Sequence, residues 1–191
     1  MALLRTHHLI CSRSGRELFT AVNLRLEAGE ALLLQGPNGS GKTSLLRALA
    51  DLLPYEGKIE KTVTHSYIGH RDAVHGDLTV CDHFHFWRGL AQERRVIFLD
   101  DILHKAGLSG METRLASTLS EGQRQRLALC RLLIEDAALW LLDEPSSALD
   151  TKGQEFLEKL LADHLAANGA AIIASHSAIK NTTPYVLGEA A

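Results

Sequence analysis

Eight consecutive residues, from position 36 to position 43, have the types and spacing that bind the phosphates of a nucleotide. They match the pattern Gly-x-x-x-x-Gly-Lys-Ser/Thr, with Lys42 and Thr43 at its end. Glycines let backbone N–H groups approach a phosphate closely, a lysine can bridge the β- and γ-phosphates, and a hydroxyl can be a ligand of Mg²⁺. We therefore expect a nucleoside triphosphate to contact Gly36, Pro37, Asn38, Gly39, Ser40, Gly41, Lys42, Thr43 and Ser44.

Two adjacent acids follow an apolar run and could complete the same site. Asp143 and Glu144 come directly after the run at positions 139–142. If this run is a strand of a parallel sheet, the acids lie at its carboxyl end, where ligands bind in such folds. We expect Asp143 to hold Mg²⁺ together with Thr43, and Glu144 to polarise the attacking water as a general base. Lys42 would neutralise charge on the phosphates during the reaction.

Short apolar runs separated by helical patterns predict the sheet that would position these residues. Such runs are near-continuous where a parallel sheet is buried on both faces. Before the phosphate loop, partial alternation that ends in an Ala-Gly turn predicts one arm of an antiparallel hairpin. The expected strands cover residues 31–35, 137–142 and 170–174, the expected helices cover residues 45–53 and 154–165, and the hairpin arm covers residues 18–26.

The segment from about residue 79 to residue 135 has a helical period instead. Thr79 with Asp82, and Ser120 with Gln123, fit capping boxes that each open a helix, and another helical stripe covers residues 96–106. The predicted fold class is therefore α/β with a mainly parallel core sheet, an N-terminal antiparallel β subdomain and an inserted helical subdomain. A single domain is expected over residues 1–191, with the core and β subdomain at about 1–72 and 136–191 and the helical subdomain at about 73–135.

Composition limits the class of protein. Hydrophobic residues make up 46% of the 191 residues, which is enough for a core and excludes intrinsic disorder. The formal net charge of -3 argues against a general nucleic-acid-binding protein, so no nucleic acid partner is expected. No apolar run is long enough to cross a bilayer, the N-terminus has no signal-peptide pattern, and the cysteines are few and far apart. These features predict a cytoplasmic location and reduced thiols.

Three further motifs resemble those of one family, the ABC-type ATPases. Residues 119–123 read LSEGQ and are similar to the LSGGQ signature of that family. Residues 147–150 resemble its D-loop, and His176 resembles its switch histidine, which contacts the γ-phosphate. The order of the motifs matches over nearly the whole chain. The resemblance implies a P-loop NTPase fold, hydrolysis of ATP with Mg²⁺, and a site that includes Ser120, Glu121, Gly122, Gln123, Ser147, Ala148, Leu149, Asp150 and His176.

The resemblance also implies how two copies would cooperate. In ABC-type ATPases two nucleotide domains face each other head to tail, so that each ATP lies between one phosphate loop and the signature helix of the other copy. The start of the helix after Ser120 is an anion-binding device without a lysine of its own. This agrees with an anion that another subunit brings, and we expect an ATP-dependent homodimer.

Two positions depart from the family pattern. Where the family has a glutamine at the beginning of its helical segment, this chain has His70. Where the family has an aromatic residue that stacks on adenine, this chain has Arg13, and a guanidinium can also stack on a ring. His70 and Arg13 are therefore candidate nucleotide contacts, and whether they touch the nucleotide stays open.

Details of the motifs resemble one branch of the family, the ATP-binding subunit of the haem exporter used in cytochrome c maturation. They are the loop sequence GPNGSGKTSLLRALADLL, the histidine in YIGH and the run ALWLLDEPSSALD. This branch implies a peripheral position on the cytoplasmic side of the inner membrane and an integral membrane subunit as partner. It also implies that ATP hydrolysis is coupled to release of a haem-loaded chaperone, with no direct haem site on this chain.

Some residues resemble sites but are expected to be structural. On a helix, Cys81 and His85 share a face and His83 points elsewhere, which leaves fewer ligands than a metal site needs. Asp100 and Asp101 follow an apolar run as the catalytic acids do. Their helical stripe continues beyond them, so we expect a structural helix there.

Two other functions stay open on the sequence alone. A soluble ABC ATPase of another pathway, such as iron–sulfur assembly, would carry the same motifs. A nucleotide-gated scaffold would bind ATP and hydrolyse it rarely. Membrane fractionation separates the first from an exporter subunit, and measurement of phosphate release separates the second.

Overall fold

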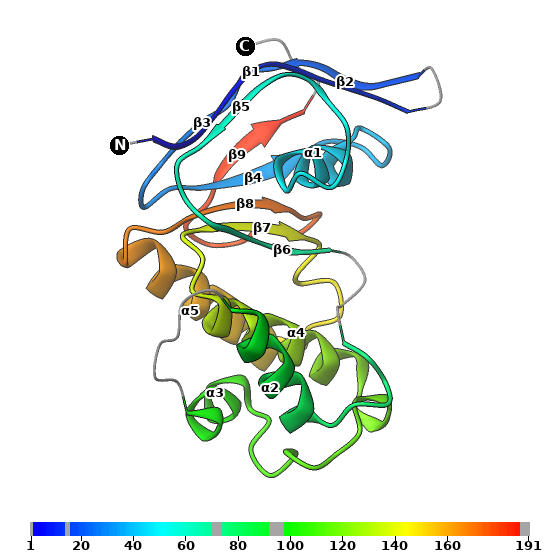
Figure 1. Cartoon of the computed structure of the whole chain (residues 1–191), viewed down its shortest axis with the longest axis vertical. Coiled ribbons are helices and arrows are strands. Elements are labelled where there is room, and N and C mark those ends of the chain that lie inside the picture. Colours follow the sequence, from blue (N-terminus) through cyan, green and yellow to red (C-terminus); the bar gives the residue numbers. More distant parts are fainter. Residues whose placement is uncertain (1, 14–15, 70–73, 92–97, 188–191) are drawn as a thin grey trace.

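Two sheets form the framework of the molecule (Figure 1). The computed structural model describes residues 2–13, 16–69, 74–91 and 98–187. One sheet is parallel with the strand order β6-β7-β8-β4-β9, and in the other β1 pairs antiparallel with β2, β3 and β5. The strands are β1 (Ala2–Arg13), β2 (Arg16–Val22), β3 (Arg25–Glu27), β4 (Ala31–Gln35), β5 (Glu56–Lys61), β6 (His65–Ile68), β7 (Leu139–Asp143), β8 (Ala170–Ala174) and β9 (Thr183–Val186).

Helices cover both faces of the parallel sheet. One face, together with α1 and the antiparallel sheet, encloses one apolar core, and the other face packs against α4 and α5 in a second core. The second core continues to α2 and α3, which lie at the far end of the molecule from the antiparallel sheet (Figure 1). The helices are α1 (Lys42–Leu49), α2 (Val80–Leu90), α3 (Leu99–Ala106), α4 (Glu121–Glu135) and α5 (Thr151–Ala166), with a short 3₁₀ turn at Ala116–Thr118.

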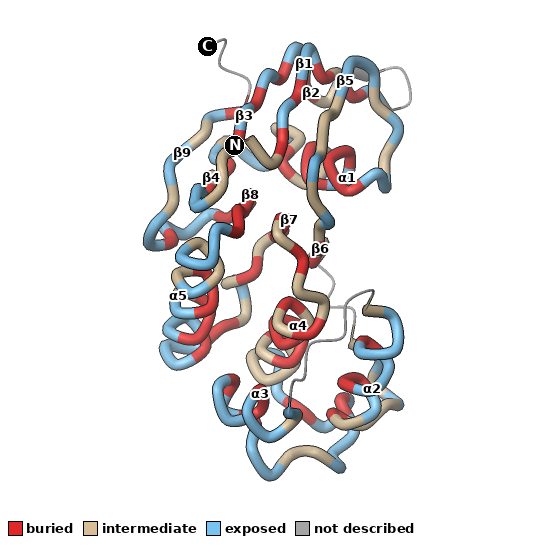
Figure 2. The backbone as a smooth tube through the Cα atoms, turned by 60° about the vertical axis from the view of Figure 1, so that its left-hand side comes forward, coloured by how far each residue is buried: buried red, intermediate tan, exposed pale blue. Residues whose placement is uncertain are grey.

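Side-chain alternation along the central strands explains why their sequences are apolar throughout. On β7, Leu139 and Leu141 belong to the core on the α1 side, whereas Trp140 and Leu142 belong to the core on the α4 side. Figure 2 shows the consequence for a covering helix, because α5 is buried along one side and exposed along the other. Since side chains alternate with period two, Asp143 is on the same face as Leu139 and Leu141. The acid that ends β7 therefore faces α1.

Most of the expected elements form, and their ends differ for local reasons. Both capping boxes are present, at the beginning of α2 and of α4. The helix expected to reach residue 53 ends at Leu49, because Asp51 adopts a left-handed conformation with φ 59°. The hairpin arm expected over residues 18–26 is divided into β2 and β3. The parallel sheet, the antiparallel sheet and the helical stretch confirm the predicted fold class.

Helix α2 carries Cys81, His83 and His85, which resemble a metal site in the sequence. Within the described ranges no cluster of three or more His, Cys, Asp and Glu side chains could hold a metal ion. His83 is buried, and its ring Nε2 accepts a hydrogen bond of 2.9 Å from the backbone N–H of His75. Its Nδ1 lies 2.8 Å from the Thr79 carbonyl oxygen, so these partners assign the proton to Nδ1. His83 is thus a satisfied core residue.

No helix among the described residues combines the length and the apolar character that a membrane span requires.

An aromatic stack joins the second core to the last turn of α5. The rings of Trp140 and His164 are nearly parallel, with centroids 3.6 Å apart. Gly169 lies so close that an added Cβ would be 2.2 Å from the imidazole ring of His164. Burial lowers the pKa of His164 from its ordinary value of 6.5, and hydrogen bonding to the backbone only partly opposes this effect. His164 is therefore neutral in the folded protein at neutral pH.

The lowered pKa of His164 predicts that the fold loses stability as the pH falls below about 6.5. In this range His164 binds a proton more readily in the unfolded chain than in the folded one, so protonation favours unfolding. His164→Phe keeps a stacking ring that cannot titrate, and its free energy of unfolding should decrease less between about pH 7 and about pH 5. Urea unfolding at several pH values measures this slope. The exposed His104→Gln variant should keep the native slope, and an unchanged slope in His164→Phe would refute the prediction.

Candidate active site

The phosphate loop leaves β4 and turns directly into α1. Gly39 and Gly41 have φ of 85° and 96°, a left-handed conformation that glycine adopts without strain. A Cβ on Gly41 would lie 2.9 Å from the carbonyl oxygen of Leu18, so a larger residue would not fit there. Gly41 is also the N-cap of α1 and offers no side chain to cap it. The first N–H groups of α1 are therefore available to an anion, which the helix dipole also favours.

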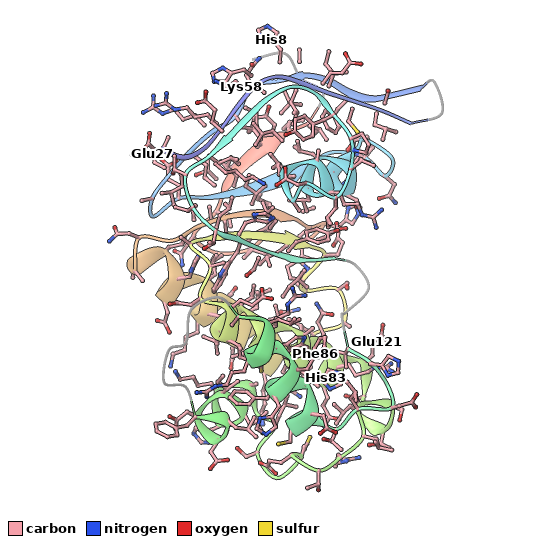
Figure 3. The ribbon with its side chains drawn as sticks, viewed as in Figure 1. His8, Glu27, Lys58, His83, Phe86 and Glu121 are labelled. Atoms are coloured by element: carbon pink, nitrogen blue, oxygen red, sulfur yellow. The ribbon has the colours of Figure 1, made fainter. Side chains whose placement is uncertain are left out.

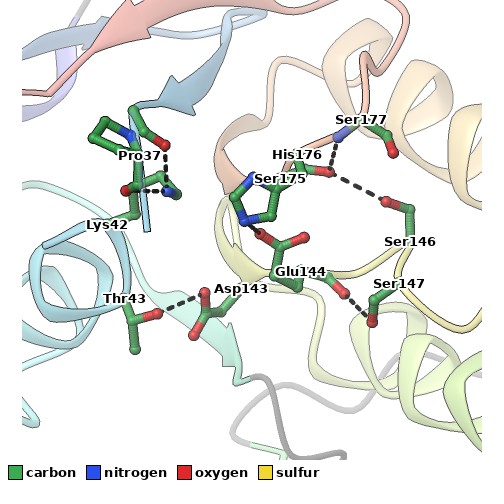
Figure 4. A network of polar contacts seen from close by, with 11 residues as sticks. Pro37, Lys42, Thr43, Asp143, Glu144, Ser146, Ser147, Ser175, His176 and Ser177 are labelled. Atoms are coloured by element: carbon green, nitrogen blue, oxygen red, sulfur yellow. Dashed lines mark hydrogen bonds and ion pairs between the residues drawn. The ribbon is translucent and has the colours of Figure 1, made fainter. Parts of the chain in front are cut away.

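Lys42 covers this loop from the first position of α1. Its Nζ donates hydrogen bonds to the carbonyl oxygens of Gly36, at 2.7 Å, and Pro37, at 3.2 Å (Figure 4). The residue is only 8% exposed. The hydroxyl of Ser40 is also buried, and it has no hydrogen-bond partner among the described residues. The ammonium group of Lys42 and the hydroxyl of Ser40 could thus donate hydrogen bonds to phosphate oxygens.

Asp143 and Thr43 meet across the interface of β7 and α1. The Thr43 hydroxyl donates to Asp143 Oδ1 at 3.0 Å, although the two residues are 100 positions apart. Asp143 is 2% exposed, and within the described part of the chain its Oδ2 is buried without a hydrogen-bond partner. Because an unpaired buried carboxylate oxygen is costly, a bound cation would stabilise it. A hydroxyl and a carboxylate are oxygen ligands of the kind that Mg²⁺ prefers, so the residues present fit this ion.

Glu144 and His176 form the opposite side of the site. His176 Nε2 lies 3.5 Å from Glu144 Oε1, and the two side chains point toward each other in Figure 4. Glu144 has a left-handed φ of 54°, and its N–H donates to the carbonyl oxygen of Ala174 at the end of β8. Its own carbonyl oxygen accepts bonds from the N–H and the hydroxyl of Ser147, at 3.3 and 3.1 Å. The carboxylate is thus held at a sharp turn beside an imidazole.

A neutral phenol lies on the strand next to the one that Asp143 ends. Tyr67 is on β6, which pairs with β7, and burial raises the pKa of its hydroxyl. Asp143 adds to the rise, whereas Arg47 partly offsets it. Tyr67 therefore stays protonated and does not bring a second negative charge to Asp143.

The phosphate loop, the start of α1 and the residues after β7 and β8 line one cavity of about 370 Å³, to which the expected contacts Gly36, Pro37 and Ser40 do not contribute. The structure brings together all three expected catalytic residues, Lys42, Glu144 and His176, and both expected Mg²⁺ ligands, Thr43 and Asp143. Leu18 of β2 also lines the cavity, although no motif in the sequence marks it. The lining residues are Leu18, Asn38, Gly39, Gly41, Lys42, Thr43, Ser44, Asp143, Glu144 and His176.

The geometry agrees with what the chain resembles among known proteins. A model of the ABC transporter family matches residues 19–147, more than half of the chain. The chain belongs to the ABC transporter family. It is 42% identical over 185 residues to the cytochrome c biogenesis ATP-binding export protein CcmA of Rhodopseudomonas palustris, with 92% of each chain covered. It is 41% identical over 187 residues to the CcmA of Xanthomonas oryzae pv. oryzae, with 92% of this chain and 87% of that protein covered.

A solved structure of the ATP-binding subunit of an ABC transporter confirms the fold. It superposes with a TM-score of 0.86 at 20% identity, and the match covers 97% of this chain and 86% of that one. The family match and the CcmA relatives make the chain an ATP-binding ABC ATPase that hydrolyses ATP.

In this ABC ATPase the signature residues lie outside the cavity of their own chain. Ser120 is the N-cap of α4, and its hydroxyl accepts a bond from the N–H of Gln123, whose side chain bonds back to the N–H of Ser120. Glu121 follows at the surface (Figure 3). None of Ser120, Glu121, Gly122 and Gln123 is among the residues that line the cavity.

The expected D-loop, residues 147–150, connects Asp143 and Glu144 with α5. Ser147 bonds to Glu144, as described above, and Asp150 is the N-cap of α5, where its carboxylate accepts a bond of 2.8 Å from the N–H of Gly153. Leu149 is buried. The motif therefore fixes the turn after Glu144 to a helix of the second core.

Two candidate nucleotide contacts of this ABC ATPase are not settled. His70 lies outside the described residues. Of Arg13 only the backbone is described, at the end of β1. Both contacts stay predictions.

A second cavity, of about 400 Å³, lies between α3, α4 and α5. Its lining includes Trp140 and His164 but none of the phosphate-loop residues or catalytic acids. The expected catalytic residues therefore line the cavity beside Lys42 and not this one.

Proposed function

We propose that this chain is the ATP-hydrolysing subunit of a membrane export complex that serves cytochrome c biogenesis. The observation that carries the proposal is the junction of α1 and β7, where the Thr43 hydroxyl meets Asp143 beside Lys42 and Glu144. The names of the relatives that are 41–42% identical over most of the chain support the pathway.

Each residue of the site has a distinct part in the reaction. Lys42 and the loop amides bind the phosphates and neutralise their charge. Thr43 and Asp143 would hold Mg²⁺, which supplies further charge neutralisation when it is bound. Glu144 accepts a proton from the attacking water, and His176, 3.5 Å from Glu144, contacts the γ-phosphate.

The second half of each nucleotide site comes from another copy of the chain. The signature residues are absent from the cavity of their own chain, and Ser120 and Glu121 are exposed at the beginning of α4. The N-terminus of this helix favours an anion. An ATP-dependent homodimer would place the helix against the γ-phosphate bound to its partner.

The chain would lie at the cytoplasmic side of the inner membrane, as a peripheral subunit bound to an integral membrane partner. Phe86 and Leu90 are 56% and 62% exposed, and they share one face of α2 because they are four positions apart. Exposed apolar side chains that gather on one face mark contact surfaces. Through this partner the ATPase cycle would release a haem-loaded chaperone, with haem handled by the partner proteins.

Isolation of the full-length chain from detergent-solubilised membranes tests the proposal. We expect one integral membrane protein to co-purify, and the complex to release phosphate from ATP continuously. Replacement of both Phe86 and Leu90 by serine should abolish co-purification. The control Leu52→Ser removes an equally exposed leucine, 61% exposed, from outside α2 and should not affect it.

Two results would contradict the proposal in different ways. Recovery of the chain in the soluble fraction, without an integral partner, would favour a soluble ABC ATPase. A membrane complex that binds ATP but shows no sustained phosphate release would favour a nucleotide-gated scaffold.

A further inference from the structure

A buried amide near the beginning of α4 has no part in the site described so far. Gln125 is only 8% exposed, although glutamine is mostly found at protein surfaces. Its side-chain Nε2 donates a hydrogen bond of 3.1 Å to the carbonyl oxygen of Pro145. A buried donor and acceptor are costly to separate once they are paired. The bond therefore fixes α4 to the residue that follows Glu144.

The backbone at Glu144 needs anchors of this kind. Its φ of 54° lies in a region that non-glycine residues rarely adopt, and such a conformation persists only where the surroundings hold it. On the other side of this turn, Ser146 Oγ lies 3.3 Å from the hydroxyl of Ser175, which precedes His176 (Figure 4). The turn is thus held between α4 and the residues that follow β8.

A second contact joins the same helix to the same turn. Gly122, in the first turn of α4, lies so close to Ala148 that an added Cβ would be 2.9 Å from the Ala148 carbonyl oxygen. Helix α4 therefore touches the segment after Glu144 at two places, Pro145 and Ala148. Because both contacts are direct, a displacement of the beginning of α4 would displace the backbone that carries Glu144.

We propose that Gln125 is a positioning residue, whose bond to Pro145 makes the position of Glu144 depend on the position of α4. This inference rests on the role proposed above for Glu144 and extends it. The beginning of α4 would meet the nucleotide of a second copy, and the carboxylate acts on the nucleotide of its own chain. Gln125 thus connects the two sites of a dimer inside one subunit.

A glutamine-to-methionine exchange tests the bond. Gln125→Met removes the donor but keeps the side-chain length and the helix propensity. Loss of one buried hydrogen bond should lower kcat about tenfold. The affinity for ATP should not change, because Gln125 does not line the cavity. Gln154→Met, at an exposed position of α5, is the matched control and should keep the native kcat.

The measurement uses the complex purified from solubilised membranes, with phosphate release at saturating ATP and a thermal unfolding curve for each variant. If Gln125→Met does not fold, Gln125→Glu takes its place under the same criteria, because an ionised carboxylate of the same shape cannot donate to Pro145.

The decisive experiment repeats the exchange in a Glu144→Gln background, with single-turnover phosphate release from radiolabelled ATP. If Gln125 acts through Glu144, the exchange should cause no further loss there. An equal loss in both backgrounds, or no loss in the native background, would overturn the inference. If Glu144 itself is not the general base, the experiment shows this separately, because Glu144→Gln alone would then keep nearly native turnover.

Discussion

Replacement of Glu144 by glutamine is expected to reduce ATP turnover by about 10²–10⁴-fold while ATP binding is retained. Glutamine fills the same space at the end of β7 but cannot accept a proton from water. The groups that bind the phosphates, Lys42 and the loop before α1, are unchanged. Because binding persists and hydrolysis stops, we also expect the variant to accumulate as a closed, ATP-bound dimer.

Light scattering with and without ATP measures the dimer, and phosphate release measures the turnover. Asp101→Asn is a suitable control, because Asp101 also follows an apolar run and a first acid, but lies exposed in the first turn of α3. It should leave both quantities at native values. Nearly native turnover in Glu144→Gln would show that another group activates the water.

Much of the site could be predicted because each residue belongs to a local pattern with a fixed place in an α/β fold. A glycine-rich turn between a strand and a helix presents backbone N–H groups and a helix N-terminus that favour a phosphate. Acids after an apolar strand of a parallel sheet lie at its carboxyl edge. Together these two rules predict that Thr43 and Asp143 lie close to each other although they are 100 positions apart. The hydrogen bond of 3.0 Å between their side chains confirms this prediction.

Leu18 could not be predicted, because its place depends on how two sheets pack. Within the sequence it is one apolar residue of an alternating strand, like Val22 or Leu24. It reaches the cavity because β2 passes over the phosphate loop, so closely that Gly41 almost touches the backbone of Leu18. No local pattern records that contact.

The missed strands and the buried glutamine have related explanations. Strands β5 and β9 carry polar or exposed residues at most positions, so they have no apolar period to detect. Gln125 stands between two arginines and is typical of an exposed helix face. Only the approach of Pro145 in the folded chain gives its amide a partner and buries it.

Replacement of Lys42 by alanine is expected to weaken ATP binding by about 10–100-fold. A hydrogen bond between charged groups contributes about 1.5–3 kcal/mol, and each 1.4 kcal/mol corresponds to about a tenfold change in affinity. Lys42 is buried at the base of the cavity, where its charge is less screened than at the surface. Titration with a fluorescent ATP analogue measures the dissociation constant directly.

Lys42 also stabilises the phosphate loop, and the experiment must separate this structural role from the binding of ATP. Its ammonium group donates hydrogen bonds to the carbonyl oxygens of Gly36 and Pro37, so alanine also removes two bonds that order the loop. A thermal unfolding curve recorded without nucleotide reports that structural part. Lys58→Ala, which removes an exposed lysine of β5, is the control for a lost surface charge. If Lys42→Ala binds the analogue as tightly as Lys58→Ala does, the loop amides alone hold the phosphates, and the charge of Lys42 serves only the loop.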